Sequence, residues 1–147
     1  MAYTAKAIAN AVIERARERN INDINPMKLQ KLIFFAQSWH LRLINQILFD
    51  DPIERWKYGP VVRDVYHEFK MFSYHPIRTY ATDALGFTPT VRPEDDFTWD
   101  FLNRILDVYG SYSATELSEM THKPDTAWSM GELNTIITIE ELARGAL

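Results

Sequence analysis

The chain of 147 residues contains no cysteine and only five glycines. Without cysteine it has no disulfide framework, no thiolate metal site and no thiol nucleophile. The five glycines are scattered along the chain, so there is no glycine-rich loop that could cradle a phosphate. What remains prominent is the aromatic content, 13% of all residues, and aromatic side chains are enriched at protein interfaces.

Long apolar runs are also absent. No stretch approaches the length of a membrane span, and no charged-then-apolar segment opens the chain. We therefore expect a cytoplasmic protein without a membrane partner. The formal net charge of −4 argues against a nucleic-acid partner, because a nucleic-acid groove usually needs a basic patch.

Recognisable catalytic and metal-binding motifs are missing as well. The four histidines, His40, His67, His75 and His122, are far apart in the sequence, and none forms an HExxH arrangement. There is no GxSxG nucleophile elbow and no P-loop. Adjacent carboxylates occur at 50–51 and 95–96, but neighbouring side chains on a helix do not face one another. The sequence thus predicts no catalytic residues, no metal and no cofactor.

Apolar residues repeat at helical spacing in most of the chain. A first helix follows Thr4 as its cap, and a second begins at Asn25-Pro26. The second helix carries an apolar stripe and further aromatics on its other sides, so we expect it to be central and buried. The residues of that stripe are Leu29, Leu32, Ile33, Ala36, His40 and Leu43.

Helices are also expected between Pro60 and Pro76, from Glu94 to Gly110, and after two capping boxes that begin at Ser113 and Thr138. Alternation over 53–58 permits a short strand, and residues 77–92 show no strong period, which predicts a loop or an irregular strand. The prediction is a mainly α-helical, compact single domain over 1–147, with five or six helices and a small β element near 53–58.

The segment 56–62 is the most informative stretch. It joins two aromatics and a cation to a Gly-Pro corner, with Gly59 free to take unusual dihedrals and Pro60 suited to the first turn of a helix. Aromatics at such a stiff corner either close an internal junction or anchor a partner, and both interpretations stay open. The candidate partner-binding residues are Trp56, Lys57, Tyr58, Gly59, Pro60, Val62, Tyr66 and Trp128.

Two further features have a structural and a functional interpretation. Lys28, Lys31 and Arg42 form either a solvated helix end or a small basic edge on the second helix. Trp128 follows a polar loop, where it either fills a gap in the core or waits for a partner.

Three ordered blocks carry a resemblance to a known family. They are 28–41 (KLQKLIFFAQSWHL), 48–62 (LFDDPIERWKYGPVV) and, further on, 117–122 with 127–129 (LSEMTH and AWS). Together they resemble the Panacea antitoxin domain, also called SocA-like or phage-associated GepA-like, from about Ala5 to Leu142. The resemblance implies an antitoxin that binds a co-encoded toxin directly, and it supplies no catalytic residues.

Other functions remain as alternatives. One is an adaptor that delivers a bound toxin or other client to a AAA+ protease. Another is a DNA-binding regulator, which the acidic balance disfavours. The sequence does not identify the toxin, the stoichiometry or the oligomeric state.

Overall fold

A computed structural model describes residues 2–147 of the chain. This part contains six α-helices, two 3₁₀ turns and three short strands. The helices are α1 (Ala5–Glu18), α2 (Pro26–Ile44), α3 (Arg63–Phe69), α4 (Asp96–Tyr109), α5 (Ala114–His122) and α6 (Ile139–Arg144). The strands are β1 (Ile53–Trp56), β2 (Gly59–Val61) and β3 (Ile136–Ile137), and the turns are η1 (Lys70–Phe72) and η2 (Trp128–Met130).

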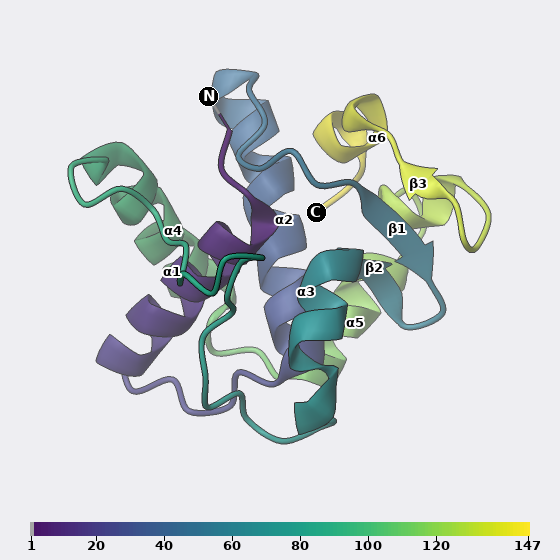
Figure 1. Cartoon of the computed structure of the whole chain (residues 1–147). Helices are drawn as coiled ribbons and strands as arrows, with labels where there is room; N and C mark the ends of the chain where they lie inside the picture. Colours follow the sequence, from purple (N-terminus) through teal and green to yellow (C-terminus); the bar gives the residue numbers. More distant parts are fainter. Residues whose placement is uncertain (1) are drawn as a thin grey trace.

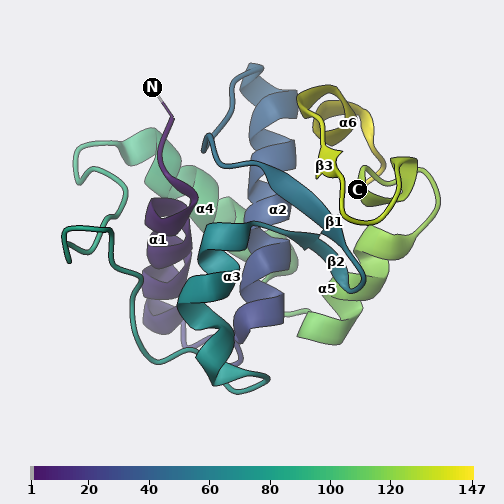
Figure 2. The ribbon, with the colours of Figure 1, turned by 45° about the vertical axis from the view of Figure 1, so that its right-hand side comes forward.

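Helix α2 runs through the middle of the molecule and contacts every other α-helix (Figure 1). In Figure 2, α1 and α4 lie on one side of it, and the β1–β2 hairpin and α5 lie on the other. Leu32, Ile33 and Ala36 are fully buried, which confirms the expectation of a central helix. The mainly helical, single-domain prediction is likewise confirmed.

The capping residues seen in the sequence set the helix starts. The side chains of Thr4, Asn25 and Asp95 accept hydrogen bonds from the first turns of α1, α2 and α4. Ser113 and Thr138 form complete capping boxes at α5 and α6, as predicted. Each cap satisfies N–H groups that a helix start leaves without internal partners.

Three strands form an antiparallel sheet in the order β2-β1-β3. The expectation that Pro60 opens a helix was wrong, because Pro60 lies in β2, opposite Arg55. Strand β2 is an edge strand, where the missing N–H of proline is tolerated. Helix α3 begins three residues later at Arg63 and ends at Phe69, well before Pro76, and η1 follows it.

Buried amide side chains fasten the surrounding loops to the helices. Gln30 on α2 both donates to the carbonyl of Val62 and accepts from its N–H, at 3.1 and 2.9 Å. Gln37 does the same for the segment Leu48–Phe49. Asn10 on α1 pairs with both main-chain groups of Ala81. Each amide thereby satisfies main-chain groups that lie outside the three-stranded sheet.

The segment 77–92 is irregular, as the missing period predicted. Its middle forms a loop in which the carboxylate of Asp83 accepts from the N–H groups of Leu85 and Phe87. Both of those apolar side chains are exposed.

Helix α2 offers a matched test of the packing, because Leu32 is fully buried whereas Leu43, expected in the same stripe, is 65% exposed. Leu32→Ala should lower the free energy of unfolding by about 2–5 kcal/mol, through lost apolar burial and a cavity. Leu43→Ala should change it by less than about 0.5 kcal/mol. Chemical denaturation measures both, and equal losses would contradict the central position of Leu32.

Candidate functional site

The sharp turn between β1 and β2 presents Lys57 and Tyr58 at its tip. Gly59 closes the turn with φ of +117°, a conformation that side-chain-bearing residues rarely adopt. A Cβ at this position would also come within 2.7 Å of the Lys31 side chain. The backbone conformation therefore requires glycine here, and a Cβ would also displace the end of the Lys31 side chain.

Three consecutive carbonyls of the hairpin are held from behind. Trp128 Nε1 donates to the carbonyl of Trp56 at 2.8 Å, and Ser118 Oγ donates to that of Tyr58 at 2.9 Å. His122 Nε2 lies 3.0 Å from the carbonyl oxygen of Lys57. The ring of Trp128 packs against His122, with centroids 4.1 Å apart. Side chains of α5 and η2 thus hold the hairpin backbone at residues 56–58. The side of the hairpin that faces α2 and α3 carries the side chains described below.

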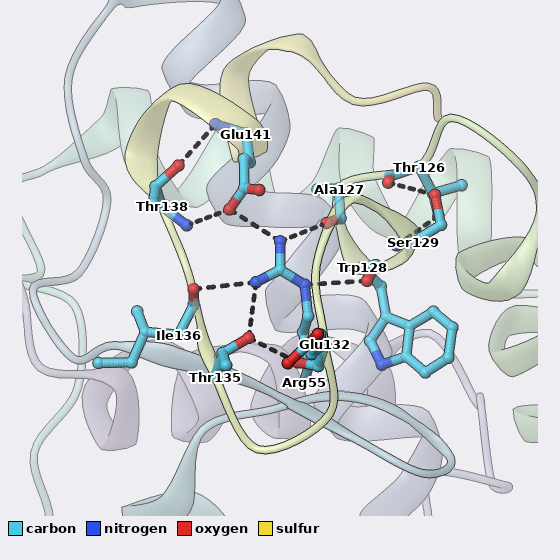
Figure 3. Close-up of polar contacts among 10 residues, drawn as sticks. All are labelled: Arg55, Thr126, Ala127, Trp128, Ser129, Glu132, Thr135, Ile136, Thr138 and Glu141. Carbon is cyan, nitrogen blue, oxygen red and sulfur yellow. Dashed lines mark hydrogen bonds and ion pairs between the residues drawn. The ribbon is translucent and has the colours of Figure 1, made fainter.

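Arg55 ties the same hairpin to the C-terminal segment (Figure 3). Its guanidinium has five N–H donors, and five acceptors surround it at 2.8 to 3.0 Å. These acceptors are the carbonyls of Ala127, Trp128 and Ile136, the hydroxyl of Thr135 and the carboxylate of Glu141. One buried side chain therefore joins β1, η2, β3 and α6.

The contact with Arg55 affects the pKa of the Glu141 carboxylate. Burial alone would raise the pKa of Glu141, but the hydrogen bonds from the Thr138 N–H and from Arg55, together with the positive charge of Arg55, outweigh it and lower the pKa. The carboxylate therefore stays ionised opposite Arg55, which retains the ion pair at neutral pH.

On the side of the hairpin that faces α2 and α3, the aromatic side chains are held in place. The rings of Trp56 and Tyr66 meet edge to face with centroids 4.8 Å apart. Trp56 Nε1 donates to Glu54, which also forms an ion pair with Arg63 at 2.8 Å. The hydrogen bond from Arg63 is the largest influence on the pKa of Glu54, and together with the one from Trp56 it lowers that pKa. Trp56 is therefore preorganised, while Tyr58 beside it is 62% exposed.

Trp56, Tyr58 and Tyr66 line a mostly apolar pocket of about 430 Å³ between the hairpin, α2 and α3. A second pocket adjoins it and shares Pro26, Met27, Tyr66 and Ser73. We call the two together the corner groove; its far end is lined by Lys70, Tyr74 and Thr115. A continuous groove of this kind suits an extended segment of a partner.

The candidate residues divide between the groove and its support. Trp56, Lys57, Tyr58 and Tyr66 line the groove. Val62 does not; it is buried, and Val61 takes the lining position. Gly59 and Pro60 are buried in the turn and β2, and Trp128 supports the hairpin from behind.

Two lysines were misjudged from the sequence. Lys28 and Lys31, expected on a solvated or basic helix edge, are 0% and 1% exposed. Lys28 Nζ binds the carboxylate of Asp23 and the carbonyl of Gly110, both at 2.7 Å. Lys31 Nζ reaches only the carbonyl of Pro60, at 3.3 Å, and lines the groove. Burial lowers the pKa of Lys31 from 10.5 to about 7.

The pH dependence of Lys31 gives a testable prediction. Since the unfolded lysine has the higher pKa, the unfolded state binds more protons between about pH 7 and 10.5, so the burial penalty is full below pH 7 and fades as pH rises. Lys31→Met should therefore raise the free energy of unfolding by about 1–4 kcal/mol at pH 6. The gain should shrink towards pH 10, as measured by denaturation of both proteins across that range. A gain that is constant with pH would contradict a buried, unpaired ammonium.

The hydrogen bonds and ion pair of Arg55 give another testable prediction. Arg55→Met should lower the free energy of unfolding by about 3–5 kcal/mol, because it removes the donors that bind five acceptors, among them the carboxylate of Glu141. Arg63→Met breaks an ion pair in which the arginine side chain is 58% exposed and screened by solvent, so it should lower the free energy of unfolding far less than Arg55→Met does. Thermal and urea unfolding of the two variants provide the comparison. Similar losses would mean that Arg55 does not hold the C-terminal segment.

Within residues 2–147, no group of three His, Cys, Asp or Glu side chains is arranged to hold a metal ion. None of the helices in this range combines the length and the apolar composition that a membrane span needs. Absence of a metal and of catalysis stays a prediction.

Comparison with known proteins identifies the family. A family model described as "Antitoxin SocA-like, Panacea domain" matches residues 29–129, from the start of α2 through the hairpin to η2. Antitoxin SocA of Caulobacter vibrioides (strain NA1000 / CB15N) is 29% identical over 130 residues, which covers 86% of this chain and 69% of that protein. No solved structure matches the chain. Since the family model spans more than half of the sequence and includes most of the corner groove, the chain belongs to the SocA-like Panacea antitoxin family.

Proposed function

We propose that this protein is the antitoxin of a toxin–antitoxin pair and neutralises a co-encoded toxin by binding it directly, without catalysis. Membership of the antitoxin family carries the proposal. The core runs from Ala5 to Leu142, so the whole chain acts as a single unit in this proposal.

The corner groove is the toxin-binding surface in this proposal. Its tip exposes Tyr58 and Lys57, while the carbonyls beneath them are fixed by Trp128, His122 and Ser118. Trp56 and Tyr66 are held by contacts within the protein. Aromatic anchors on a rigid support lose little conformational entropy on binding, and such residues dominate binding energy at many interfaces.

The first experiment asks whether a toxin exists. A neighbouring reading frame that arrests growth when expressed alone, and is rescued by co-expression of this chain, would support the pair. Rescue should persist in a host that lacks its AAA+ proteases, and purified toxin should bind the chain. Rescue that requires the protease would instead support the adaptor alternative.

The second experiment tests the surface. Lys57→Glu and Tyr58→Ala should each weaken toxin binding by about 2 kcal/mol or more, the range of interface anchors. Both side chains are exposed, so the unfolding midpoint should stay close to that of the wild type. Calorimetric binding and melting are measured on the same samples.

The matched control is Leu85→Ala, which removes an exposed apolar side chain in the 83–87 loop. It should leave toxin binding unchanged. If Leu85→Ala weakens binding and the two hairpin variants do not, the toxin binds the irregular segment, and the groove assignment is wrong.

A further inference from the structure

Two lysines one turn apart on α2 differ in how their charge is balanced. Both are buried, yet Lys28 has the carboxylate of Asp23 and the carbonyl of Gly110 as close partners. Lys31 has a single carbonyl at 3.3 Å, and no carboxylate of residues 2–147 lies within ion-pair distance of its Nζ. An ammonium offers three donors, so the hydrogen-bonding capacity of Lys31 is largely unused.

A buried charge without a counterion is costly for a fold. Its depressed pKa reports the same cost. The space beside Lys31 is not closed, because the side chain forms part of the lining of the corner groove. A carboxylate of a partner bound in the groove would therefore lie next to this side chain.

The charges along the groove have one sign. Lys31 and Lys57 line its first pocket, and Lys70 lines the second. No aspartate or glutamate lines either pocket, although the chain as a whole has a net charge of −4. Between these cations the walls are aromatic and aliphatic, with Trp56, Met27 and Tyr66 among them. Three separated lysines match several carboxylates along a segment better than one chain-terminal carboxylate.

We propose that the corner groove binds an extended acidic segment of the toxin, in which one side-chain carboxylate pairs with Lys31 and an adjacent apolar side chain packs against Trp56 and Tyr66. This inference rests on the proposed function, since it names the toxin feature that the groove recognises. Pairing supplies the counterion that the chain itself gives to Lys28 but not to Lys31. Charge complementarity would then select acidic segments over neutral ones of the same shape.

The test uses defined peptide probes and the full chain. The acidic probe is acetyl-Glu-Phe-Glu-Leu-Glu-amide, with both ends blocked, and its neutral match carries glutamine in place of glutamate. A third probe is the neutral peptide with a free C-terminal carboxylate. Binding is measured by NMR, following the Trp56 indole N–H and the Lys31 Cε signal.

The acidic probe should bind at least tenfold more tightly than either neutral peptide, shift the Trp56 signal and raise the pKa of Lys31, because a bound carboxylate favours the ammonium form. Lys31→Met should reduce its affinity at least tenfold. Lys6→Met, which removes an equal charge outside the groove, should have little effect.

Equal binding of acidic and neutral peptides, preference for the free C-terminus, binding of none of the probes, or an acidic preference that survives Lys31→Met would each overturn the inference. The wild-type comparison does not depend on any variant being folded. Growth rescue by the chain tests the proposed function separately, so a failed peptide result with intact rescue would remove only the acidic-segment inference.

Discussion

The fold depends on how helix α2 satisfies the polar side chains that it carries into the core. Gln30 and Gln37 bind main chain at the end of β2 and before β1, and Lys28 binds main chain just after α4. Buried polar groups without partners would cost several kcal/mol, so each of these contacts fixes the position of a neighbouring segment. Arg55 does the same on β1, the central strand of the sheet, where its five donors bind the segment from η2 to α6.

This arrangement supports the proposal that the hairpin is a binding surface. Its main chain is fixed by Gln30 on one side and by Ser118 and Trp128 on the other. The fold therefore bears the entropic cost of ordering the groove before any partner arrives. Lys31 departs from the pattern, because its charge is buried with little internal compensation. Stability sacrificed at one position is typical of a site whose partner comes from outside.

The sequence predicted the helices well because their signals are local. Capping residues and apolar spacing placed α1, α2, α4, α5 and α6, and alternation placed β1. Pro60 was misplaced because its fixed φ suits an edge strand as well as a helix start. Lys28 and Lys31 were misread because lysine is rarely buried, and the carbonyls of Gly110 and Pro60 that they reach lie far along the chain. The support from Ser118 and His122 had no local signal beyond the block that carried the family resemblance.

The central claim is that the toxin binds the corner groove. Hydrogen–deuterium exchange of the free chain and of its complex with the toxin tests this most directly. Amides at the exposed rim, Lys57, Tyr58, Ser73 and Tyr74, should exchange more slowly in the complex, while those of the 83–87 loop should not change. Protection confined to that loop or to another face, with unchanged exchange around the groove, would contradict the account.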